Sequence, residues 1–402
     1  MAKRSVREGS VYKYKTRTGA TRWRYQVWVP SEEGSVDSIR MGEGGFLTPD
    51  EADSAMLEVL ARTRRHEPVL PKSAMPTLET YSKAWLGGLV NLQSSTIQGY
   101  EKNLRNHLVP YLGSYRIDQL KPTLLNQHFK KLQSGGRKDS KDAGGALSAN
   151  TIHKVGTVLS LILESAIDDN LLAVNPMRKA KLPSISKADE QLKVWNLEQI
   201  KLFLDWDKRE QQDDLNALWH LMAFTGVRRG EAVALMWSDL DLIAARMQVT
   251  KATDASQSRV VKETKTKKSR RNLKLDELTV FTLKKHKTER ALLGLQMVSA
   301  DAWVFGGLNG QLRVPNDVTA RWTRVMEKAV AHFGSDALPR VTLKGLRHTH
   351  ATTLLSMNVN AKVVQERLGH SAYHVTMDIY SHVTETMQDD AVTELSRRYE
   401  SA

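Results

Sequence analysis

The sequence contains no cysteine. This absence excludes disulfide bonds, thiolate catalysis, and zinc or iron–sulfur centres with cysteine ligands. Long apolar runs are missing too, and none approaches the roughly 20 residues that a membrane-spanning helix needs. No apolar stretch follows the start Met-Ala-Lys-Arg-Ser, so neither a signal peptide nor a membrane partner is expected. A Gly-rich Walker loop of the kind found in ATP-binding enzymes is also not found.

Acidic residues are fewer than basic residues in this sequence. The 402 residues include 59 lysines and arginines against 45 aspartates and glutamates, which gives a formal net charge of +14 and a pI near 9.7. This excess favours a polyanionic partner, most simply nucleic acid, although charge alone is also compatible with a merely basic protein. We therefore expect a cytoplasmic, DNA-facing protein that is long enough for two or three domains.

Residues 1–66 predict a small three-stranded sheet packed on one helix. Alternating patterns at 10–15 and 22–29 flank a Thr-Gly turn, and a third short strand is expected at 36–41. The run Thr48-Pro-Asp-Glu then provides a helix start with a capping threonine and a reciprocal glutamate.

This first segment is rich in positive charge. Its first 30 residues hold eight basic side chains against one acid, and the basic residues alternate with aromatic ones. Such a sheet face suits insertion into a DNA groove, so Arg22 and Arg24 are candidate DNA contacts. A solvated sheet face over a small core is the alternative interpretation.

The region 77–182 predicts a compact bundle of amphipathic helices, preceded by a linker at 67–76 that contains three prolines. The four helices are expected at 77–86, 94–108, 122–133 and 148–168, with a flexible polar insertion at 135–145. Candidate phosphate contacts in this bundle are Lys102, Arg105 and Lys154, together with His107, Lys130 and Lys131. Each of them, taken alone, is more simply explained as a solvated charge on a helix face.

Residues 183–402 are expected to form a mainly α-helical domain with a small antiparallel sheet. Short strands are expected at 246–250, 259–264 and 271–275, and a turn dense in lysine and arginine joins the last two. Four tryptophans are assigned to core or interface packing: Trp195, Trp237, Trp303 and Trp322. The chain as a whole is thus predicted to be an α+β multidomain protein.

The most informative stretch runs from Leu343-Lys-Gly-Leu-Arg347-His-Thr-His350 through Leu368-Gly-His370 to Tyr380. It offers a guanidinium, an imidazole and a phenol over a short span, and Arg228 adds a second guanidinium from a helix far upstream. Arginine stays charged and its planar fork matches two phosphate oxygens, so this set suits a phosphodiester under attack by an oxygen nucleophile. A tyrosine hydroxyl, with a pKa near ~10, needs cationic neighbours or a base to act as that nucleophile.

Neighbouring residues receive supporting roles. Glu231, one turn after Arg228, is expected to orient the arginines through a buried ion pair. His348 and His350 are interpreted as structural groups around Arg347, because a third ligand and an acidic partner for a metal site are missing. We therefore expect no metal ion and no other cofactor.

Four ordered motifs carry a specific resemblance to a known family. They are Thr225-Gly-Val-Arg-Arg-Gly-Glu231, Lys344-Gly-Leu-Arg-His-Thr-His-Ala-Thr352, Leu368-Gly-His370 and Asp378-Ile-Tyr-Ser-His382. The chain resembles the tyrosine recombinases of the phage and integrative-element integrase type. The resemblance implies that Arg228 and Arg347 are the catalytic arginine pair, that His370 is the second histidine-class residue, and that Tyr380 is the nucleophile.

The roles of two lysines follow from the same resemblance. The box that family members usually open with histidine opens here with Lys344, which can donate to a phosphate but cannot act as a base at neutral pH in the same way. In the family, a lysine on the cationic hairpin turn protonates the departing deoxyribose oxygen, and the Lys-Thr-x-x-Ser-x-Arg pattern points to Lys265. Lys267 and Lys268 compete for this role; otherwise they contact phosphates or are simply solvated.

The resemblance also implies the domains, the reaction and the partners. Residues 1–66 would be an arm-type DNA-binding domain, 77–182 a core-binding domain, and 183–402 the catalytic domain. The implied reaction is site-specific cleavage and rejoining of DNA through a 3′-phosphotyrosyl intermediate, which integrates and excises a phage genome or other mobile element in a bacterial host. A homotetramer on double-stranded DNA with core-type and arm-type sites is implied, together with a host bending protein and a directionality factor.

Three other functions fit parts of the pattern. A type IB topoisomerase uses similar chemistry without synapsis, but the arm-like first segment and an amphipathic helix expected at 389–398 argue against it. A DNA-binding regulator with a decayed catalytic domain would account for Lys344, and a metal-dependent nuclease would use the histidines. Tyr373 and Tyr399 are alternative nucleophiles, of which the first follows His370 too closely and the second lies in the tail.

Overall fold

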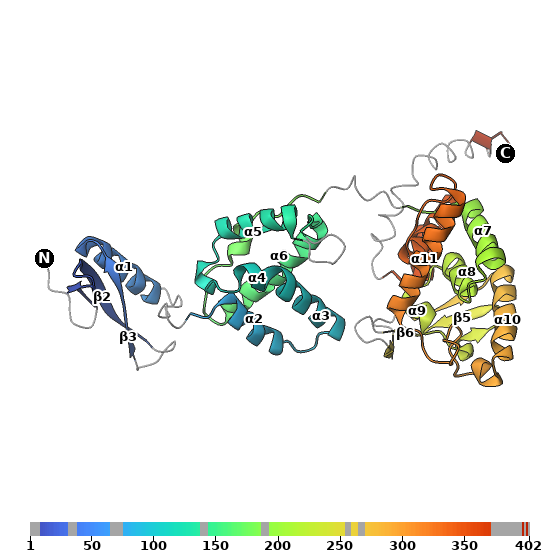
Figure 1. The fold of residues 1–402 in the computed structure, drawn as a ribbon, viewed down its shortest axis with the longest axis horizontal. Helices are drawn as coiled ribbons and strands as arrows, with labels where there is room; N and C mark the ends of the chain where they lie inside the picture. The colour runs from blue at the N-terminus through green and yellow to red at the C-terminus, as the bar shows by residue number, and fades with distance from the viewer. Residues whose placement is uncertain are drawn as a thin grey trace. The chain divides into compact units, whose positions relative to one another are not determined.

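The predicted α+β fold class is confirmed by the computed structural model, in which helices predominate and the sheets are small and antiparallel (Figure 1). The structure describes residues 9–30, 38–64, 75–136, 144–185, 193–253, 259–263, 270–370, 396–397 and 399–400. Its internal contacts divide the chain into two units, 1–187 and 188–402. Among the described residues, no helix is both long enough and apolar enough to cross a bilayer.

The N-terminal part is a sheet of strands β1 (Ser10–Lys15), β2 (Thr21–Pro30) and β3 (Ser38–Phe46), in that order, covered on one face by helix α1 (Pro49–Arg64). A small core between sheet and helix contains Tyr25, Val27, Val29, Met41 and Met56. The helix begins as predicted, because the Thr48 hydroxyl accepts from the Glu51 amide at 3.2 Å and the Glu51 carboxylate accepts from the Thr48 amide.

Strand β3 is longer than predicted, because it continues through the glycines at 42, 44 and 45 instead of ending before them. A Cβ on Gly42 would come within 2.4 Å of the Tyr25 carbonyl, so only glycine allows this close strand pairing. The pairing of β2 with β3 shifts register between Trp23 and Arg24, because β3 has one extra residue, Gly45, in a β-bulge at this point.

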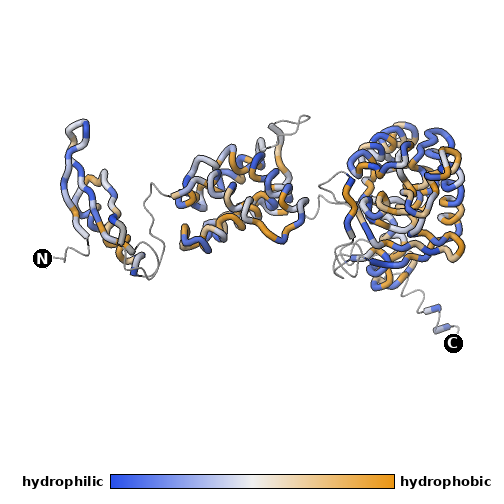
Figure 2. Tube along the Cα trace, turned by 90° about the horizontal axis from the view of Figure 1, so that it is seen from below, coloured by the Kyte–Doolittle hydropathy of each residue, from blue (hydrophilic) through white to orange (hydrophobic). Residues whose placement is uncertain are grey.

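The next part is the predicted helical bundle. Its helices are α2 (Leu78–Gly87), α3 (Ser94–Asn103), α4 (Val109–Leu112), α5 (Pro122–Gly135) and α6 (Ala149–Asp168). Thr77 and Ser148 cap α2 and α6 through their hydroxyls. Hydrophobic and hydrophilic stretches alternate along the helices in Figure 2, as expected when one face of each helix packs on a core.

The helix expected at 94–108 is instead interrupted by a π-helical turn at Leu104–Leu108. Pro110 has no amide hydrogen and its ring opposes the carbonyl four residues earlier, so the regular hydrogen-bond ladder fails here. The Val109 amide accordingly bonds the Leu104 carbonyl five residues back.

The C-terminal unit contains seven α-helices within its described residues: α7 (Leu197–Trp206), α8 (Asn216–Thr225), α9 (Arg229–Val233), α10 (Glu277–Leu292), α11 (Pro315–Phe333), α12 (Leu343–Ser356) and α13 (Ala361–Leu368). Trp195, Trp237 and Trp322 are buried in its core and Trp303 packs against it, as the sequence analysis expected. The indole of Trp322 donates to the Val341 carbonyl at 2.9 Å and so fixes the approach to α12.

The strands of this unit form two separate sheets. Strands β4 (Leu240–Asp241), β5 (Arg246–Val249) and β8 (Arg271–Lys274) make one, and β6 (Lys251–Thr253) and β7 (Val261–Glu263) make the other. The predicted strand at 259–264 therefore pairs with β6, which was not predicted, and not with β8. The alternation pattern showed that these strands exist but not which of them pair.

Candidate active site

Two helices of the C-terminal unit end at glycines that bring distant motifs together. Gly226 closes α8 and Gly369 closes α13, both in the left-handed conformation with φ of +65° and +68°. A Cβ on Gly226 would lie 2.6 Å from the Leu368 side chain and 2.8 Å from the His350 ring, so the two helix ends pack with no room for a larger residue. The residues that follow, Arg228 and His370, therefore begin from neighbouring points.

Arg347 lies on α12 between these two helix ends. Its guanidinium donates to the Gly226 carbonyl at 2.7 Å and to the Leu368 carbonyl at 2.8 Å, and the residue is 7% exposed. Burial, with the nearby charges of Arg228 and Arg271, lowers the pKa of Arg347 to about 9, so the group remains cationic at neutral pH. A buried guanidinium surrounded by other guanidiniums is stabilised when an anion binds to it.

Arg228 is the more accessible arginine of the pair, with 43% of its side chain exposed. It donates to the Glu231 carboxylate at 2.8 Å and to the Gly369 carbonyl at 2.8 Å. Glu231 is buried and forms the ion pair that the sequence analysis expected. Burial opposes ionisation of this carboxyl, but hydrogen bonds and charge from Arg271 and Arg228 lower its pKa nevertheless.

Two further arginines of the site were missed from the sequence. Arg271, on β8, donates to both carboxylate oxygens of Glu231 and to the Arg367 carbonyl. The Arg367 side chain donates to the His350 ring at 3.1 Å and to the Phe224 carbonyl at 3.2 Å. A signal for Arg271 was present, because strand alternation places it on the same face as the buried Leu273.

His370 follows Gly369 at the end of α13 and is half-buried. Its amide donates to the Gln365 carbonyl, and its own carbonyl accepts from the Gln365 side chain. Burial and the charges of Arg347 and Arg228 lower the pKa of its imidazole to about 4. His370 is therefore neutral at pH 7 and lies in the positive field of the two predicted catalytic arginines.

The other predicted residues on α12 differ in their surroundings. Lys344, in the first turn, is exposed, one turn before Arg347 and on the same helix face. His350 is buried, and its ring accepts from Arg367 and bonds the Ala223 carbonyl at 3.1 Å, so it joins α12 to α8 and α13 without a hydrogen bond to Arg347. The pKa of His348 is lowered to about 4 by burial and by Lys344 and Arg347.

Four of the predicted residues, Lys265, Lys267, Lys268 and Tyr380, lie outside the described residues. The structure thus brings together Arg228, Arg347, His370 and Glu231, with Lys344 one turn before Arg347 on α12. Within the described ranges, no group of histidine and acidic side chains has an arrangement that could bind a metal ion.

The candidate DNA contacts that the structure describes lie on the N-terminal unit. Lys102 on α3, Arg105 in the π-helical turn and Lys154 on α6 are exposed, as are Lys130 and Lys131 on α5. The prediction for His107 was wrong, since this residue is only 7% exposed and belongs to the core side of its turn. Arg22 and Arg24 pair with Tyr14 and Tyr12 across β1 and β2, and the Arg24 guanidinium lies 5.4 Å from the Tyr12 ring centroid.

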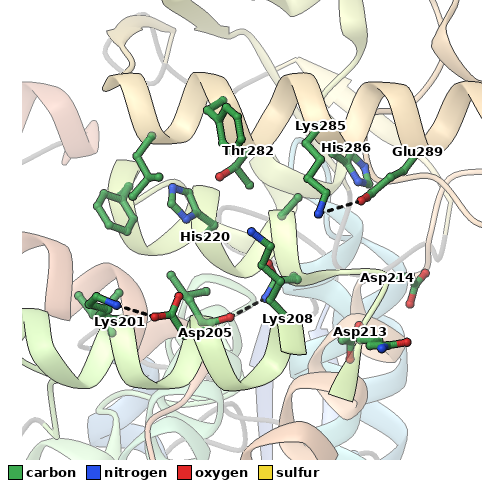
Figure 3. Close-up of a pocket in the computed structure, with 18 of the residues that line it drawn as sticks. Lys201, Asp205, Lys208, Asp213, Asp214, His220, Thr282, Lys285, His286 and Glu289 are labelled. Carbon is green, nitrogen blue, oxygen red and sulfur yellow. Dashed lines mark hydrogen bonds and ion pairs between the residues drawn. The ribbon is translucent and has the colours of Figure 1, made fainter. Parts of the chain in front are cut away.

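A cavity of about 750 Å³ lies between α7, α8 and α10, apart from the arginine cluster (Figure 3). Its charged side chains include ion pairs within single helices, between Lys201 and Asp205 at 2.5 Å and between Lys285 and Glu289 at 3.6 Å. Leu278 and Phe281 expose apolar surface at its rim. No arginine is found among the described residues that line the cavity.

We expect an anion at the arginine cluster to raise the pKa of His370, because it would offset the positive charges that now oppose protonation. NMR titration of histidine-labelled protein, with the His370 signal assigned through His370→Gln, would measure this in the presence and absence of sulfate. His220 is a suitable control, because burial alone is the main cause that lowers its pKa to about 4. An unchanged His370 titration in saturating sulfate would contradict this description of the site.

Comparison with known proteins supports one family. Residues 193–387 match the model of the phage integrase family, and residues 77–133 match that of the phage integrase N-terminal SAM-like domain. A XerC-like tyrosine recombinase of Caldanaerobacter subterraneus is 25% identical over 80% of this chain and 83% of its own length. The ICEBs1 integrase of Bacillus subtilis is 25% identical over 84% of this chain and 88% of its own length.

Solved structures share the fold. The Tn1549 transposon integrase, in a complex with transposon right-end DNA, superposes with a TM-score of 0.65 at 21% identity, covering 80% of this chain and 99% of that one. A lambda integrase dimer bound to a core site gives a TM-score of 0.56 at 14% identity, covering 91% of this chain and 93% of that one.

Proposed function

The chain belongs to the phage integrase family of tyrosine recombinases, and we propose that it cleaves and rejoins DNA at specific sites to integrate and excise a mobile element. The observation that carries this proposal is the convergence of Arg228, Arg347 and His370 at the facing ends of α8 and α13. Tyr380 follows His370 by ten residues in the sequence, which is a short enough connection for its phenol to reach the same point.

The first chemical step would be attack of the Tyr380 phenol oxygen on the scissile phosphorus. The phenol proton would pass to the neutral imidazole of His370 as the new bond joins tyrosine to the 3′ phosphate. The bond to the 5′ oxygen breaks, and that oxygen leaves as a hydroxyl. Arg228 and Arg347 would bind the nonbridging oxygens, which gain negative charge in the transition state, and each such donor is worth roughly 3–4 kcal/mol. Lys265 would supply the proton to the leaving 5′ oxygen, a role that typically accelerates such steps by about 10²–10⁴-fold.

The second step would reverse the first with a different strand. A 5′ hydroxyl from the partner duplex attacks the phosphotyrosyl linkage, reseals the strand and returns Tyr380 to its starting state. The energy of the broken bond is held in the covalent intermediate, so the cycle consumes no ATP. Lys344 would donate to the phosphate from the first turn of α12, in the place where the family resemblance leads us to expect histidine.

The same proposal assigns the DNA contacts and partners. Residues 1–66 would bind arm-type sites through the β-sheet face with Arg22 and Arg24, and residues 77–182 would bind core-type sites through Lys102, Arg105 and Lys154. Lys267 and Lys268 would contact phosphates beside Lys265. Two duplexes with two strands each require four protomers, assisted by a host bending protein and a directionality factor in the bacterial cytoplasm.

A nicked duplex that carries the attachment site tests the proposal, because loss of the short fragment beside the nick traps the covalent intermediate. The site itself can be found by sequencing the direct repeats that flank the element. We expect an adduct that resists denaturant, and peptide mapping should place the nucleotide on Tyr380. Cleavage without a covalent protein–DNA bond would overturn the proposal.

A further inference from the structure

Three consecutive carbonyl groups at the end of α13 each accept a hydrogen bond from a different arginine. The Arg367 carbonyl accepts from Arg271 at 2.7 Å, the Leu368 carbonyl from Arg347 at 2.8 Å, and the Gly369 carbonyl from Arg228 at 2.8 Å. The last carbonyls of a helix have no partner within the helix and carry its negative partial charge, so cations bind them well. The next residue, His370, is thereby held at a fixed point relative to all three guanidiniums.

Arg271 differs from the other two arginines because it reaches this point from the sheet. Alternation along β8 turns its side chain to the core face with Leu273, and that side chain is only 7% exposed. Its Nε, Nη1 and Nη2 all donate to the Arg367 carbonyl or to the Glu231 carboxylate, so its guanidinium already faces groups of the protein. Its hydrogen bonds are therefore available for holding other groups of the site.

Those hydrogen bonds join Arg228 to the turn that leads to His370. One side of the Arg271 guanidinium donates to Glu231 at 2.9 Å, and Glu231 in turn fixes Arg228. Its Nε donates to the Arg367 carbonyl, and its Nη1 lies 3.1 Å from where a Cβ on Gly369 would be, so it packs closely against the turn that leads to His370. Displacing Arg271 would therefore remove a support both from Arg228, through Glu231, and from the turn that leads to His370.

We propose that Arg271 is a positioning residue for strand cleavage, which sets the Arg228 guanidinium and the His370 turn in one geometry through simultaneous bonds to Glu231 and the end of α13. This inference rests on the proposed function. The role requires the planar fork of arginine, because a lysine ammonium is a single point that can neutralise Glu231 but cannot span the carboxylate and the carbonyl together.

The test compares Arg271→Lys with wild type in single-turnover cleavage of the nicked duplex, with DNA affinity measured separately. We expect the rate of adduct formation to fall about 10²-fold, as for a misplacement of about 1 Å at a reacting centre, while the Kd for DNA stays within a few-fold of wild type. The His370 imidazole resonance should also shift in this variant.

Arg290→Lys is the matched control, because Arg290 is another buried arginine of this unit, 6% exposed, whose Nη2 donates to the Gly307 carbonyl at 3.0 Å away from the cluster. Its cleavage rate and His370 resonance should equal those of wild type at a comparable unfolding midpoint. If Arg271→Lys is too unstable to assay, Arg271→Ala with added methylguanidinium replaces it, and rescue of cleavage is expected.

The outcomes separate the two proposals. An adduct in wild type with an unchanged rate in Arg271→Lys, or equal losses in Arg271→Lys and Arg290→Lys, would overturn the positioning role alone. Failure of methylguanidinium to restore any cleavage to a folded Arg271→Ala protein would also count against it. Absence of an adduct in wild type would remove the proposed function, and the positioning role with it.

Discussion

Tyr380→Phe is expected to form no covalent complex with the nicked duplex and to bind it as well as wild type. The substitution removes one oxygen and leaves the aromatic ring, so the arginines proposed to bind the phosphate and the proposed DNA-binding surfaces are unchanged. Without the phenol there is no atom at this position that can bond to phosphorus. Denaturing gel electrophoresis measures the adduct, and gel-shift titration measures the affinity.

Tyr399→Phe serves as the control for this substitution. Tyr399 is 84% exposed and is the alternative nucleophile in the tail, so its removal should leave the adduct yield at the wild-type level. An adduct that persists in Tyr380→Phe and disappears in Tyr399→Phe would assign the chemistry to the other tyrosine. The same comparison with Tyr373→Phe covers the remaining alternative.

Glu231→Gln is expected to be the most destabilising polar substitution of the cluster. The Glu231 carboxylate is 3% exposed and pairs with both Arg228 and Arg271, close to the charge of Arg347. Removing one partner of a buried ion pair leaves the other charge uncompensated, which typically costs about 3–5 kcal/mol. Here two arginines would be left, so urea unfolding at pH 7 should show a loss of at least that order.

The loss of stability caused by Glu231→Gln should depend on pH and on the presence of anions. Because the folded-state pKa of Glu231 is lowered, its contribution is present above the unfolded value of about 4.3 and is lost as pH falls through the folded pKa. The difference between wild type and Glu231→Gln should therefore be full at pH 7 and shrink below about pH 4. Sulfate should restore part of the lost stability of the variant, because an anion can replace the missing negative charge. A difference that is the same at pH 7 and pH 3.5 would contradict this account.

Local signals in the sequence predicted much of the fold. The capping threonine Thr48 and the reciprocal glutamate predicted the start of α1, because a capping hydroxyl satisfies a backbone amide wherever the helix lies. The Thr-Gly-Val-Arg and Leu-Gly-His patterns place glycines at the ends of α8 and α13, where each adopts the left-handed conformation and allows the two ends to pack closely.

Local sequence signals do not predict which residues or strands far apart in the sequence pair with each other. Nothing local to Arg271 indicates that its partner is Glu231, forty residues earlier, since a buried ion pair depends on how separate elements pack. The division of the strands between two sheets has the same cause. The π-helical turn before Val109 depends on how the chain relieves the clash around Pro110, and the proline alone predicts only that the helix is disturbed.

The central claim is that the arginines act on the negative charge of the scissile phosphate. Its most direct test compares wild type with Arg228→Ala on three nicked duplexes. One has a natural phosphodiester at the scissile position, and the other two have a neutral methylphosphonate there, one of each configuration. On the phosphodiester we predict that the variant forms adduct about 10²–10³-fold more slowly. On the methylphosphonate of one configuration the two proteins should react at nearly equal rates, because the charge that Arg228 stabilises is absent. The account would be contradicted if wild type were faster than Arg228→Ala by as large a factor on both methylphosphonates as on the phosphodiester.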